Sequence, residues 1–207
     1  MIPSFNSICH KHDLKISGVI HVGSHHAEEV PSYIEAGINN IVLFEPLKDN
    51  FSYIKKAILP YQHLNIRKYR VALGNNHKTI IMNLASNALE SSSILKPKLH
   101  LKTYPDIAFD SKEEVELHRL DEYNCEECNF LNMDVQGYEL EVLKGAQKTL
   151  KHIDYVYCEV NCKENYENNA LIEDIDYFLK EYSMSRIDTF WWLDDGWGDA
   201  LYIKNAI

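Results

Sequence analysis

Two acidic residues end apolar stretches in the second half of the chain. Asp134 follows F-L-N-M, and Glu159 follows I-D-Y-V-Y-C, with Asn161 two positions later. If both stretches are neighbouring strands of a parallel sheet, their carboxyl ends meet at one edge and the three polar side chains converge. Buried acids of this kind act as general bases, or hold a hard divalent cation such as Mg²⁺ or Mn²⁺. The structural alternatives are a turn-capping carboxylate for Asp134 and a buried hydrogen-bonding partner for Glu159, but burying charge for structure alone is costly.

A second pattern lies near the N-terminus, in G-V-I-H-V-G-S-H-H-A and N-I-V-L-F-E-P. An apolar strand ends in a turn at Gly23, a short helix follows, and a second apolar strand ends at Glu45, 22 positions after Gly23. This is about the spacing at which a βαβ unit presents a carboxylate to a ribose. The pattern therefore predicts a nucleotide-type cofactor site.

The residues of this turn discriminate between cofactors. A dinucleotide requires G-x-G-x-x-G, but His25 and Ala27 occupy the region where further glycines are expected. S-adenosylmethionine has no phosphate, and requires a tight turn, polar groups for its methionine end and an acid for its ribose. Gly23, Ser24 and His25 can supply the first two and Glu45 the third. An NAD(P)-dependent oxidoreductase remains an alternative that the incomplete glycine pattern disfavours.

Composition sets outer bounds on the function. The chain has 207 residues, which suits one α/β domain, and a formal net charge of −10 without a dense run of Lys and Arg. Such a surface repels phosphate backbones, so we expect no nucleic-acid substrate. No stretch is long and apolar enough for a membrane span, and the N-terminus lacks a signal-peptide pattern. With five cysteines, an odd number, these features predict reduced thiols and a cytoplasmic protein.

Strand and helix patterns alternate along almost the whole chain, which predicts one α/β domain, residues 1–207, with a mostly parallel sheet. Residues 1–17 read as an N-terminal extension, and 85–112 as an irregular lid or substrate loop. Asn168 or Asn169 is expected to cap the last helix. The remaining helices are expected after the first strand, at 47–59 and at 138–151, and the strands at 18–23, 40–45, 66–73, 79–84, 115–120, 130–135, 153–160 and, as a hairpin around D-D-G-W-G-D, within 186–203.

Several motifs together resemble the FkbM family of S-adenosylmethionine-dependent methyltransferases. They are V-I-H-V-G-S-H-H-A-E-E, L-F-E-P, V-A-L-G, S-S-S-I-L, H-R-L-D-E-Y, C-E-V-N and, most specifically, D-V-Q-G-Y-E-L-E-V-L-K-G-A, between about residues 18 and 162. The resemblance implies a Rossmann-like class I methyltransferase fold: α/β, with a seven-stranded mostly parallel sheet, helices on both faces and a C-terminal antiparallel hairpin. It also implies O-methyl transfer to sugars or natural-product hydroxyls.

The residues and the resemblance together predict a site. Asp134 and Glu159 are the candidate catalytic residues, and these two with Asn161 are the candidate metal ligands. Many family members have D-x-G where this chain has His21, so Glu28 and backbone carbonyls are expected to hold the methionine amino group. The candidate cofactor-binding residues are His21, Gly23, Ser24, His25, Glu28, Glu45, Pro46, Ala72, Leu73, Ser92, Asp134 and Val135.

We therefore expect an S-adenosylmethionine-dependent O-methyltransferase that acts on a hydroxyl of a sugar or glycan. The alternatives are transfer to a small natural product and a non-catalytic nucleotide-binding module on the same fold. The three tryptophans Trp191, Trp192 and Trp197 either stack on a sugar ring or form core or homodimer contacts. Asp199 reads as an ordinary turn acid that could also reach the crevice. Cys125 and Cys128 alone are too few ligands for structural zinc.

Overall fold

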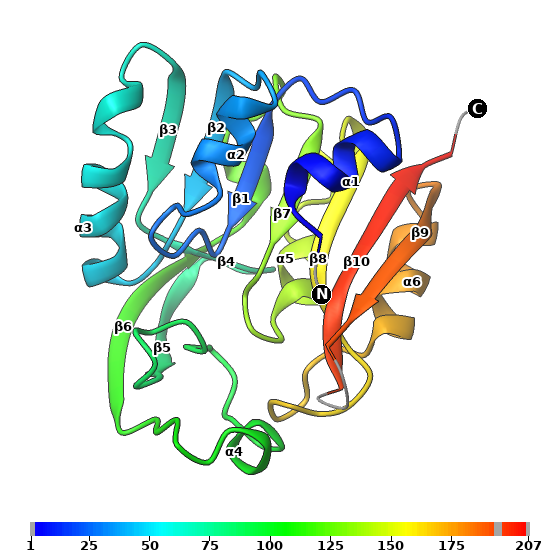
Figure 1. Cartoon of the computed structure of the whole chain (residues 1–207). Coiled ribbons are helices and arrows are strands. Elements are labelled where there is room, and N and C mark those ends of the chain that lie inside the picture. Colours follow the sequence, from blue (N-terminus) through cyan, green and yellow to red (C-terminus); the bar gives the residue numbers. More distant parts are fainter. Residues whose placement is uncertain (1–2, 193–195, 206–207) are drawn as a thin grey trace.

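The computed structural model describes residues 3–192 and 196–205. Its main sheet has seven strands in the order β3-β2-β1-β7-β8-β10-β9 (Figure 1). The five strands from β3 to β8 run parallel, whereas β10 is antiparallel to both of its neighbours. This confirms the expected sheet and its C-terminal antiparallel hairpin. The strands are β1 (Val19–Val22), β2 (Asn40–Phe44), β3 (Asn65–Tyr69), β7 (Phe130–Met133), β8 (Tyr155–Asn161), β9 (Met184–Trp191) and β10 (Trp197–Lys204).

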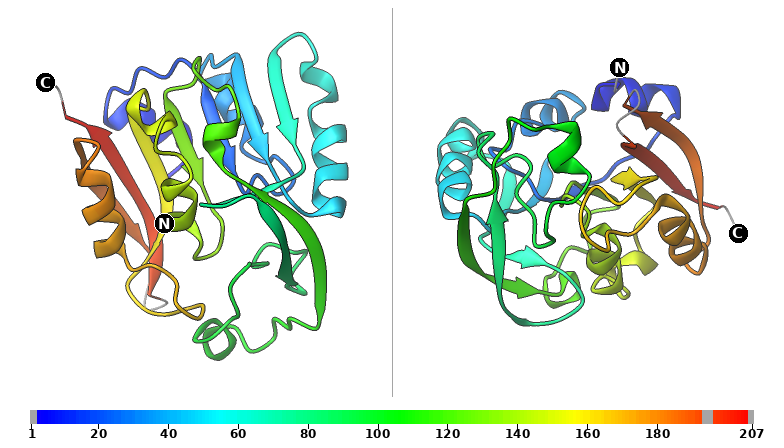
Figure 2. Two further views of the ribbon diagram at one scale, coloured as in Figure 1. Left: turned by 180° about the vertical axis from the view of Figure 1, so that it is seen from behind. Right: turned by 90° about the horizontal axis from the view of Figure 1, so that it is seen from below.

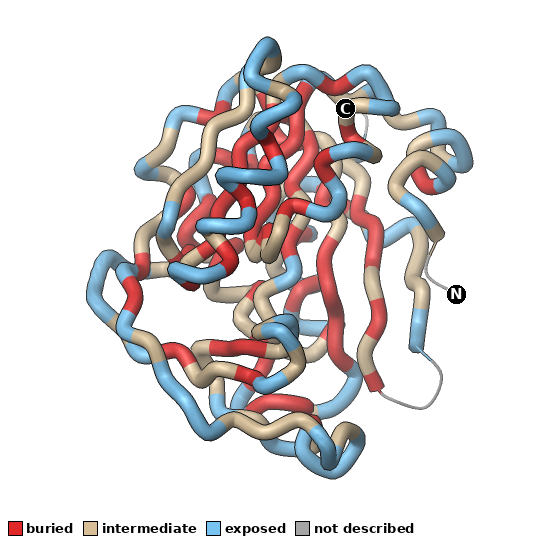
Figure 3. Tube along the Cα trace, turned by 60° about the vertical axis from the view of Figure 1, so that its left-hand side comes forward, coloured by how far each residue is buried: buried red, intermediate tan, exposed pale blue. Residues whose placement is uncertain are grey.

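Helices cover both faces of this sheet (Figures 1 and 2). On one face lie α1 (Phe5–Lys11), α2 (Val30–Glu35) and α3 (Lys48–Ala57), and on the other α5 (Glu139–Lys144) and α6 (Ile172–Lys180). Successive strand residues point to opposite faces: Val19 joins the core under α2 and α3, whereas Ile20 joins the core under α5 and α6. Because both faces are covered, the central strands are mostly apolar and buried (Figure 3).

A second, smaller sheet was not expected from the sequence. It has the order β4-β6-β5, formed by β4 (Ala72–Leu73), β5 (Lys78–Leu84) and β6 (Ser111–His118). The predicted strand 66–73 was therefore wrong as one element: it leaves the main sheet after Tyr69, and Ala72 and Leu73 pair with β6 instead. Their side chains pack with Leu47 and Met82 in a separate small core, and burial of these apolar groups stabilises the pairing with β6. The predicted strand 115–120 is shifted, since it begins at Ser111 and gives way to a 3₁₀ turn, Leu120–Glu122.

The segment predicted as irregular, 85–112, connects β5 to β6 as the long loop of a hairpin. It contains the short helix α4 (His100–Thr103) and overlaps the start of β6. Backbone hydrogen bonds tie it to the segment that follows β8: the Lys98 N–H donates to Asn165 O (2.8 Å) and the Glu167 N–H to Lys96 O (2.8 Å). The loop is thus ordered by contacts far away in sequence, and its role as a lid stays a prediction.

Two helices end earlier than predicted. The helix expected over 138–151 is α5 followed by a 3₁₀ turn, Thr149–Lys151. The break falls at Gly145, where a Cβ would lie 1.9 Å from Gly74 O, so only glycine allows this close approach. Residues 59–61 form a separate 3₁₀ turn after α3.

Neither Asn168 nor Asn169 caps α6. Its N-cap is Leu171, whose N–H donates to the side chain of Asp174 (2.9 Å), three residues into the helix. The Asn169 side chain instead accepts from the Tyr166 N–H (2.9 Å), so it shapes the loop before the helix. The expected D-D-G-W-G-D connection between β9 and β10 falls partly on residues 193–195, outside the described residues. Within the described part of the chain, no helix has the length and apolar character needed to cross a bilayer.

Candidate active site

A cavity of about 810 Å³ opens along the carboxyl ends of the parallel strands. Residues of β1, β7 and β8, with Glu45 just after β2, line its base, and the small sheet, the 85–112 loop and the N-terminal segment line its sides. In Figure 1 the small sheet and α4 lie beyond the tips of the β1, β2 and β3 arrows. This is the edge at which open α/β sheets bind ligands, and both predicted groups of residues reach it.

The turn after β1 requires glycine. Gly23 has φ +78°, and a Cβ there would lie 1.8 Å from the carbonyl oxygen of Asp134. The N–H groups of Gly23 and Ser24 both donate to Phe44 O, at 2.9 and 3.1 Å, which fixes the turn against β2. Ser24 is fully buried and is not among the residues that line the cavity; its hydroxyl faces Phe44 O at 3.4 Å. Ser24 therefore supports the turn rather than facing a ligand.

Glu45 is held ready to accept a further hydrogen bond. Its Oε1 accepts from the Leu47 N–H (2.9 Å) and the Asn50 amide (3.4 Å), and its Oε2 accepts from the His25 N–H (3.0 Å). A carboxylate oxygen has two acceptor positions, so Oε2 retains one for a ribose hydroxyl. Burial raises the pKa of Glu45 to about 7, although these donors favour its ionised form.

The two histidines of the turn differ in environment. His25 places Nδ1 2.9 Å from Glu28 Oε1 and Nε2 2.9 Å from Ala88 O, so it links the turn to the 85–112 loop. Burial opposes its charged form, but these two acceptors leave the pKa of His25 raised. His21 is buried beside the Tyr33 hydroxyl (3.1 Å), and desolvation lowers the pKa of its imidazole. Both histidines and Glu28 line the cavity.

The remaining predicted cofactor residues line the same cavity. Beside the turn, it is walled by the apolar side chains of Leu47 and Met82. A flat, largely apolar ring such as adenine suits this wall. The predicted residues that contribute to the lining here are Pro46, Ala72, Leu73, Ser92 and Val135.

The two predicted catalytic acids meet at one amide group that sequence reasoning missed. Gln136 Nε2 donates to Asp134 Oδ1 (2.6 Å) and to Glu159 Oε2 (2.8 Å). Gln136 adopts φ +54°, an uncommon conformation for a residue with a side chain, and such outliers gather at functional sites. The Tyr166 hydroxyl donates to Gln136 Oε1 (2.8 Å) and holds the amide in this orientation. The D-V-Q-G motif was visible in sequence, but the direction of its glutamine was not.

Asn161 supports Glu159 from behind. Its amide nitrogen donates to Glu159 Oε1 (3.1 Å), and its oxygen accepts from the Asn165 amide (2.8 Å). Asn161 is buried and does not line the cavity. With amide N–H groups on both sides of Glu159, this arrangement is not the set of free oxygens that Mg²⁺ or Mn²⁺ prefers. A divalent cation at Asp134, Glu159 and Asn161 stays a prediction from the sequence.

Four acids gather around this centre, and all have raised pKa values. Burial and the neighbouring carboxyls of Asp134, Glu139 and Asp199 raise the pKa of Glu159 well above its usual range. Burial likewise raises the pKa of Asp134, and those of Glu139 and Asp199 to about 7. The expectation that Asp199 is a turn acid was wrong: it lies within β10, paired with Glu159 across the sheet, and lines the cavity.

The buried acid Glu139 was also missed. It is the first residue of α5, and its Oε1 accepts from the N–H groups of Val135 (3.0 Å) and Gly137 (3.2 Å). Glu139 thus caps the turn after β7, which was the structural alternative considered for Asp134. Asp134 therefore does not have to cap this turn. In the sequence, only its position at the end of an apolar strand could have indicated that it has another role.

The cysteine pair that was considered as a metal site does not belong to a group of three ligands among the described residues. Cys125 and Cys128 are buried, and burial raises the pKa of both thiols. Among the described residues, groups of three His, Cys, Asp or Glu side chains close enough for one metal ion are His25 with His26 and Glu28, and His77 with His118 and Glu122. Neither group contains a cysteine.

Comparison with known proteins places the chain in a family. Residues 21–185 match the Methyltransferase FkbM domain, so the protein belongs to the FkbM methyltransferase family. The 2-O-methyltransferase NoeI of Sinorhizobium fredii is 34% identical over 98 residues, which cover 45% of this chain and 40% of NoeI. The crystal structure of methyltransferase FkbM from Methylobacillus flagellatus superposes with a TM-score of 0.60 at 16% identity, over 90% of this chain and 43% of that one.

More distant structures share the same fold. A putative tRNA methyltransferase of Streptococcus pneumoniae in complex with S-adenosyl-L-methionine gives a TM-score of 0.57 at 11% identity, over 100% of this chain and 75% of that one. These neighbours confirm the Rossmann-like methyltransferase fold. The chain spans less than half the length of NoeI and of the Methylobacillus protein.

Proposed function

We propose that the protein is an S-adenosylmethionine-dependent O-methyltransferase that acts on a hydroxyl of a sugar or glycan. The observation that carries the proposal is that Glu45, after β2, and the Asp134–Gln136–Glu159 group, at the ends of β7 and β8, face one cavity at the same edge of the sheet. Membership of the FkbM family supports methyl transfer. A relative named as a 2-O-methyltransferase supports oxygen as the accepting atom.

The residues present fit the cofactor. Gly23 allows a tight turn, Glu45 Oε2 has an acceptor position for a ribose hydroxyl, and Ala72 and Leu73 provide an apolar wall for adenine. Glu28, at the mouth of the turn, can hold the methionine amino group where other family members use an acid in place of His21. When bound, S-adenosylmethionine supplies a methyl group already activated on a sulfonium sulfur.

The chain's own task is to align the acceptor and take its proton. Both oxygens of Glu159 accept amide hydrogen bonds and the residue is buried, whereas Asp134, which hydrogen-bonds with Gln136 and Glu159, is an exposed residue that lines the cavity. We therefore assign Asp134 as general base. Asp134 would take the proton of the acceptor hydroxyl as that oxygen receives the methyl group. Glu159 orients Gln136, while desolvation and the charge of Glu29 raise the pKa of Asp134.

The first test is calorimetric titration of the full chain with S-adenosylhomocysteine and, in parallel, NADH. We expect micromolar binding of S-adenosylhomocysteine alone, and at least tenfold weaker binding by Glu45→Gln. Glu114→Gln, on the exposed side of β6, is the matched control and should bind normally. Binding of NADH alone would favour an oxidoreductase, and silence towards both would favour a non-catalytic module.

The second test separates chemistry from cofactor binding. With an acceptor found by screening glycans for S-adenosylhomocysteine release, Asp134→Asn should lower kcat by roughly 10²–10⁴-fold, the range typical of a lost general base. Its affinity for S-adenosylhomocysteine should stay within a few-fold of the wild type. If Asp134→Asn loses cofactor binding while Glu45→Gln loses only turnover, our division of roles is refuted.

A further inference from the structure

The cavity walls carry many acids and, among the described residues that line them, no lysine or arginine. A phosphate, sulfate or carboxylate on an acceptor would therefore find acidic side chains that offer it no positive charge, and no guanidinium or ammonium partner. S-adenosylmethionine carries two positive groups, an ammonium and a sulfonium, and one negative carboxylate. Its net positive charge is compatible with the acidic lining. The acidic lining residues are Glu28, Glu29, Glu45, Glu90, Asp134, Glu159 and Asp199.

The histidines of the cavity do not substitute for the missing cations. Burial lowers the pKa of both His21 and His100, so neither imidazole offers a positive charge near neutral pH. The pKa of His25 is raised, but both of its ring nitrogens are already engaged by Glu28 and Ala88. An anionic acceptor group thus has no compensating partner among these side chains.

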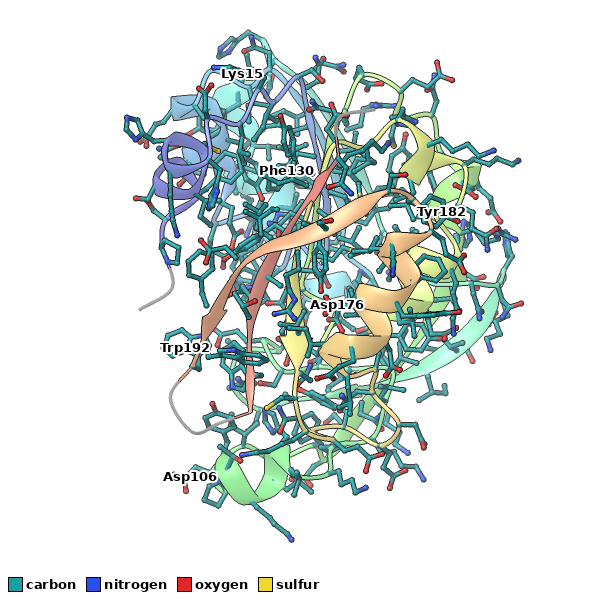
Figure 4. All side chains as sticks on the ribbon, turned by 90° about the vertical axis from the view of Figure 1, so that its right-hand side faces the viewer. Lys15, Asp106, Phe130, Asp176, Tyr182 and Trp192 are labelled. Atoms are coloured by element: carbon teal, nitrogen blue, oxygen red, sulfur yellow. The ribbon has the colours of Figure 1, made fainter. Side chains whose placement is uncertain are left out.

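An aromatic wall stands on the side of the cavity away from the Gly23 turn. The Trp197 Nε1–H donates to the Tyr104 hydroxyl (3.0 Å), and the ring of Trp192 lies 5.3 Å from that of Trp197. These three residues and His100 line the cavity. Figure 4 shows Trp192 at the end of β9, on the side of the molecule where α4 lies. Indole and phenol rings are apolar faces with polar edges, the surfaces on which sugar rings stack.

His100 provides an independent sign of a missing ligand. The residue is only 6% exposed, and its Nδ1 is buried with no hydrogen-bond partner among the described residues. Such an orphaned polar atom destabilises the folded protein. Because Nδ1 is out of reach of solvent here, a hydroxyl of a bound acceptor satisfies it once the ring, which lines the cavity, turns toward that acceptor.

This wall connects directly to the reaction centre. The ring of His100 lies 5.5 Å from that of Tyr166, whose hydroxyl donates to Gln136 Oε1 (2.8 Å). Gln136 in turn bridges Asp134 and Glu159. A ring resting on the wall therefore lies beside the proposed base.

We propose that the acceptor is a glycan without anionic groups, recognised by His100 and Trp197. The cavity rejects phosphorylated, sulfated and carboxylated sugars, nucleotide sugars included. This inference rests on the proposed methyltransferase function and adds the charge class of its acceptor. His100 and Trp197 are specificity-determining residues that the sequence patterns did not single out together.

The test is a glycan array probed with the labelled full chain saturated with S-adenosylhomocysteine. The array should carry each neutral glycan beside its sulfated, phosphorylated or sialylated form. We expect binding to neutral or amine-bearing glycans, with the anionic form of the same glycan bound at least tenfold more weakly. Equal or stronger binding of anionic forms, or no glycan bound at all, overturns the inference.

Variants connect the binding to the aromatic wall. His100→Phe and Trp197→Phe should each weaken glycan binding at least fivefold without changing affinity for S-adenosylhomocysteine. The control is Trp191→Ala: this tryptophan is 43% exposed and does not line the cavity, so glycan binding should persist. Unchanged glycan binding in both His100→Phe and Trp197→Phe overturns the assignment. Because S-adenosylhomocysteine is titrated separately, failure of the acceptor inference and failure of the methyltransferase function give different results.

Discussion

The Gly23–Glu45 turn of the cavity is built by one short stretch of chain, whereas the aromatic wall is assembled from several distant ones. Gly23, His25 and Glu45 all belong to the β1–α2–β2 unit, and their hydrogen bonds run within that unit or to the adjoining loop. His100, Tyr166 and Trp197 come from three separate segments that only the tertiary fold brings together. The part of a site whose ligand is the same in related proteins can be built by one local unit. The part whose ligand differs can be built by loops, which change independently on a fixed scaffold.

The largest expected effect is a change that breaks the cofactor side alone. Gly23→Ala places a methyl group 1.8 Å from Asp134 O, and should destabilise the protein by more than about 3 kcal/mol and abolish S-adenosylhomocysteine binding. Gly37→Ala is the control, since Gly37 also has positive φ but nothing within 4 Å of its Cβ. It should cost only about 1–2 kcal/mol of backbone strain. Thermal unfolding and calorimetry measure both, and equal losses would show that contact with Asp134 is unimportant.

An effect of intermediate size is expected from Glu139, one of the acids that lie between the two sides of the cavity. Burial raises the pKa of Glu139 from 4.5 to about 7, so the folded state holds a proton that the unfolded chain releases. The resulting stability is fully present below about pH 4.5 and is lost as pH rises through about 7. Glu139→Gln should remove this dependence, so its stability relative to the wild type should increase by up to about 3 kcal/mol from pH 4.5 to 8.

Urea unfolding of both proteins across this pH range measures the difference. Gln keeps an oxygen that can accept from Val135 and Gly137, so the cap itself survives the substitution. A stability difference that stays constant with pH would contradict a proton held by Glu139.

The smallest effect tests how the acceptor side holds the reaction centre. Tyr166→Phe removes the donor to Gln136 Oε1 and to Ser91 O. Loss of one such hydrogen bond is worth about 1 kcal/mol, so kcat should fall roughly five- to tenfold while affinity for S-adenosylhomocysteine is unchanged. Tyr177→Phe, at a position 75% exposed, should leave both unaltered. A drop in cofactor affinity instead would mean that the two sides are not separable.

The same contrast explains how much the sequence could predict. Gly23, Glu45, Asp134 and Glu159 stand at the ends of apolar strands, and their convergence follows from the parallel sheet alone. The cofactor role of Ser24 stays a prediction; its side chain does not line the cavity, because adjacent side chains of a turn point in different directions and spacing does not tell which one faces it. The helix break at Gly145 depends on the backbone of Gly74, a contact far away in sequence.

The acceptor side could not be predicted from the sequence for the same physical reason, because its contacts join segments that are far apart in the chain. The exit of β4 to a second sheet is decided by packing with β6, and only this sheet carries the loop that contains His100. The orphaned Nδ1 of His100 and the orientation of Gln136 are properties of assembled surroundings, not of residue type. Trp197 and Asp199 were named from sequence, but their place beside Tyr104 and Glu159 required the register of β10.

The amide of Gln136 has one more consequence for how this centre responds to its surroundings. An amide does not titrate, so it donates to Asp134 and Glu159 whichever of the two carries a proton. The carboxyl groups can exchange charge while the distance between them is kept by a neutral spacer. Under the proposed function, this neutral bridge would keep the two carboxyl groups aligned in either protonation state, so a change in pH would alter how many molecules are competent rather than how they hold an acceptor.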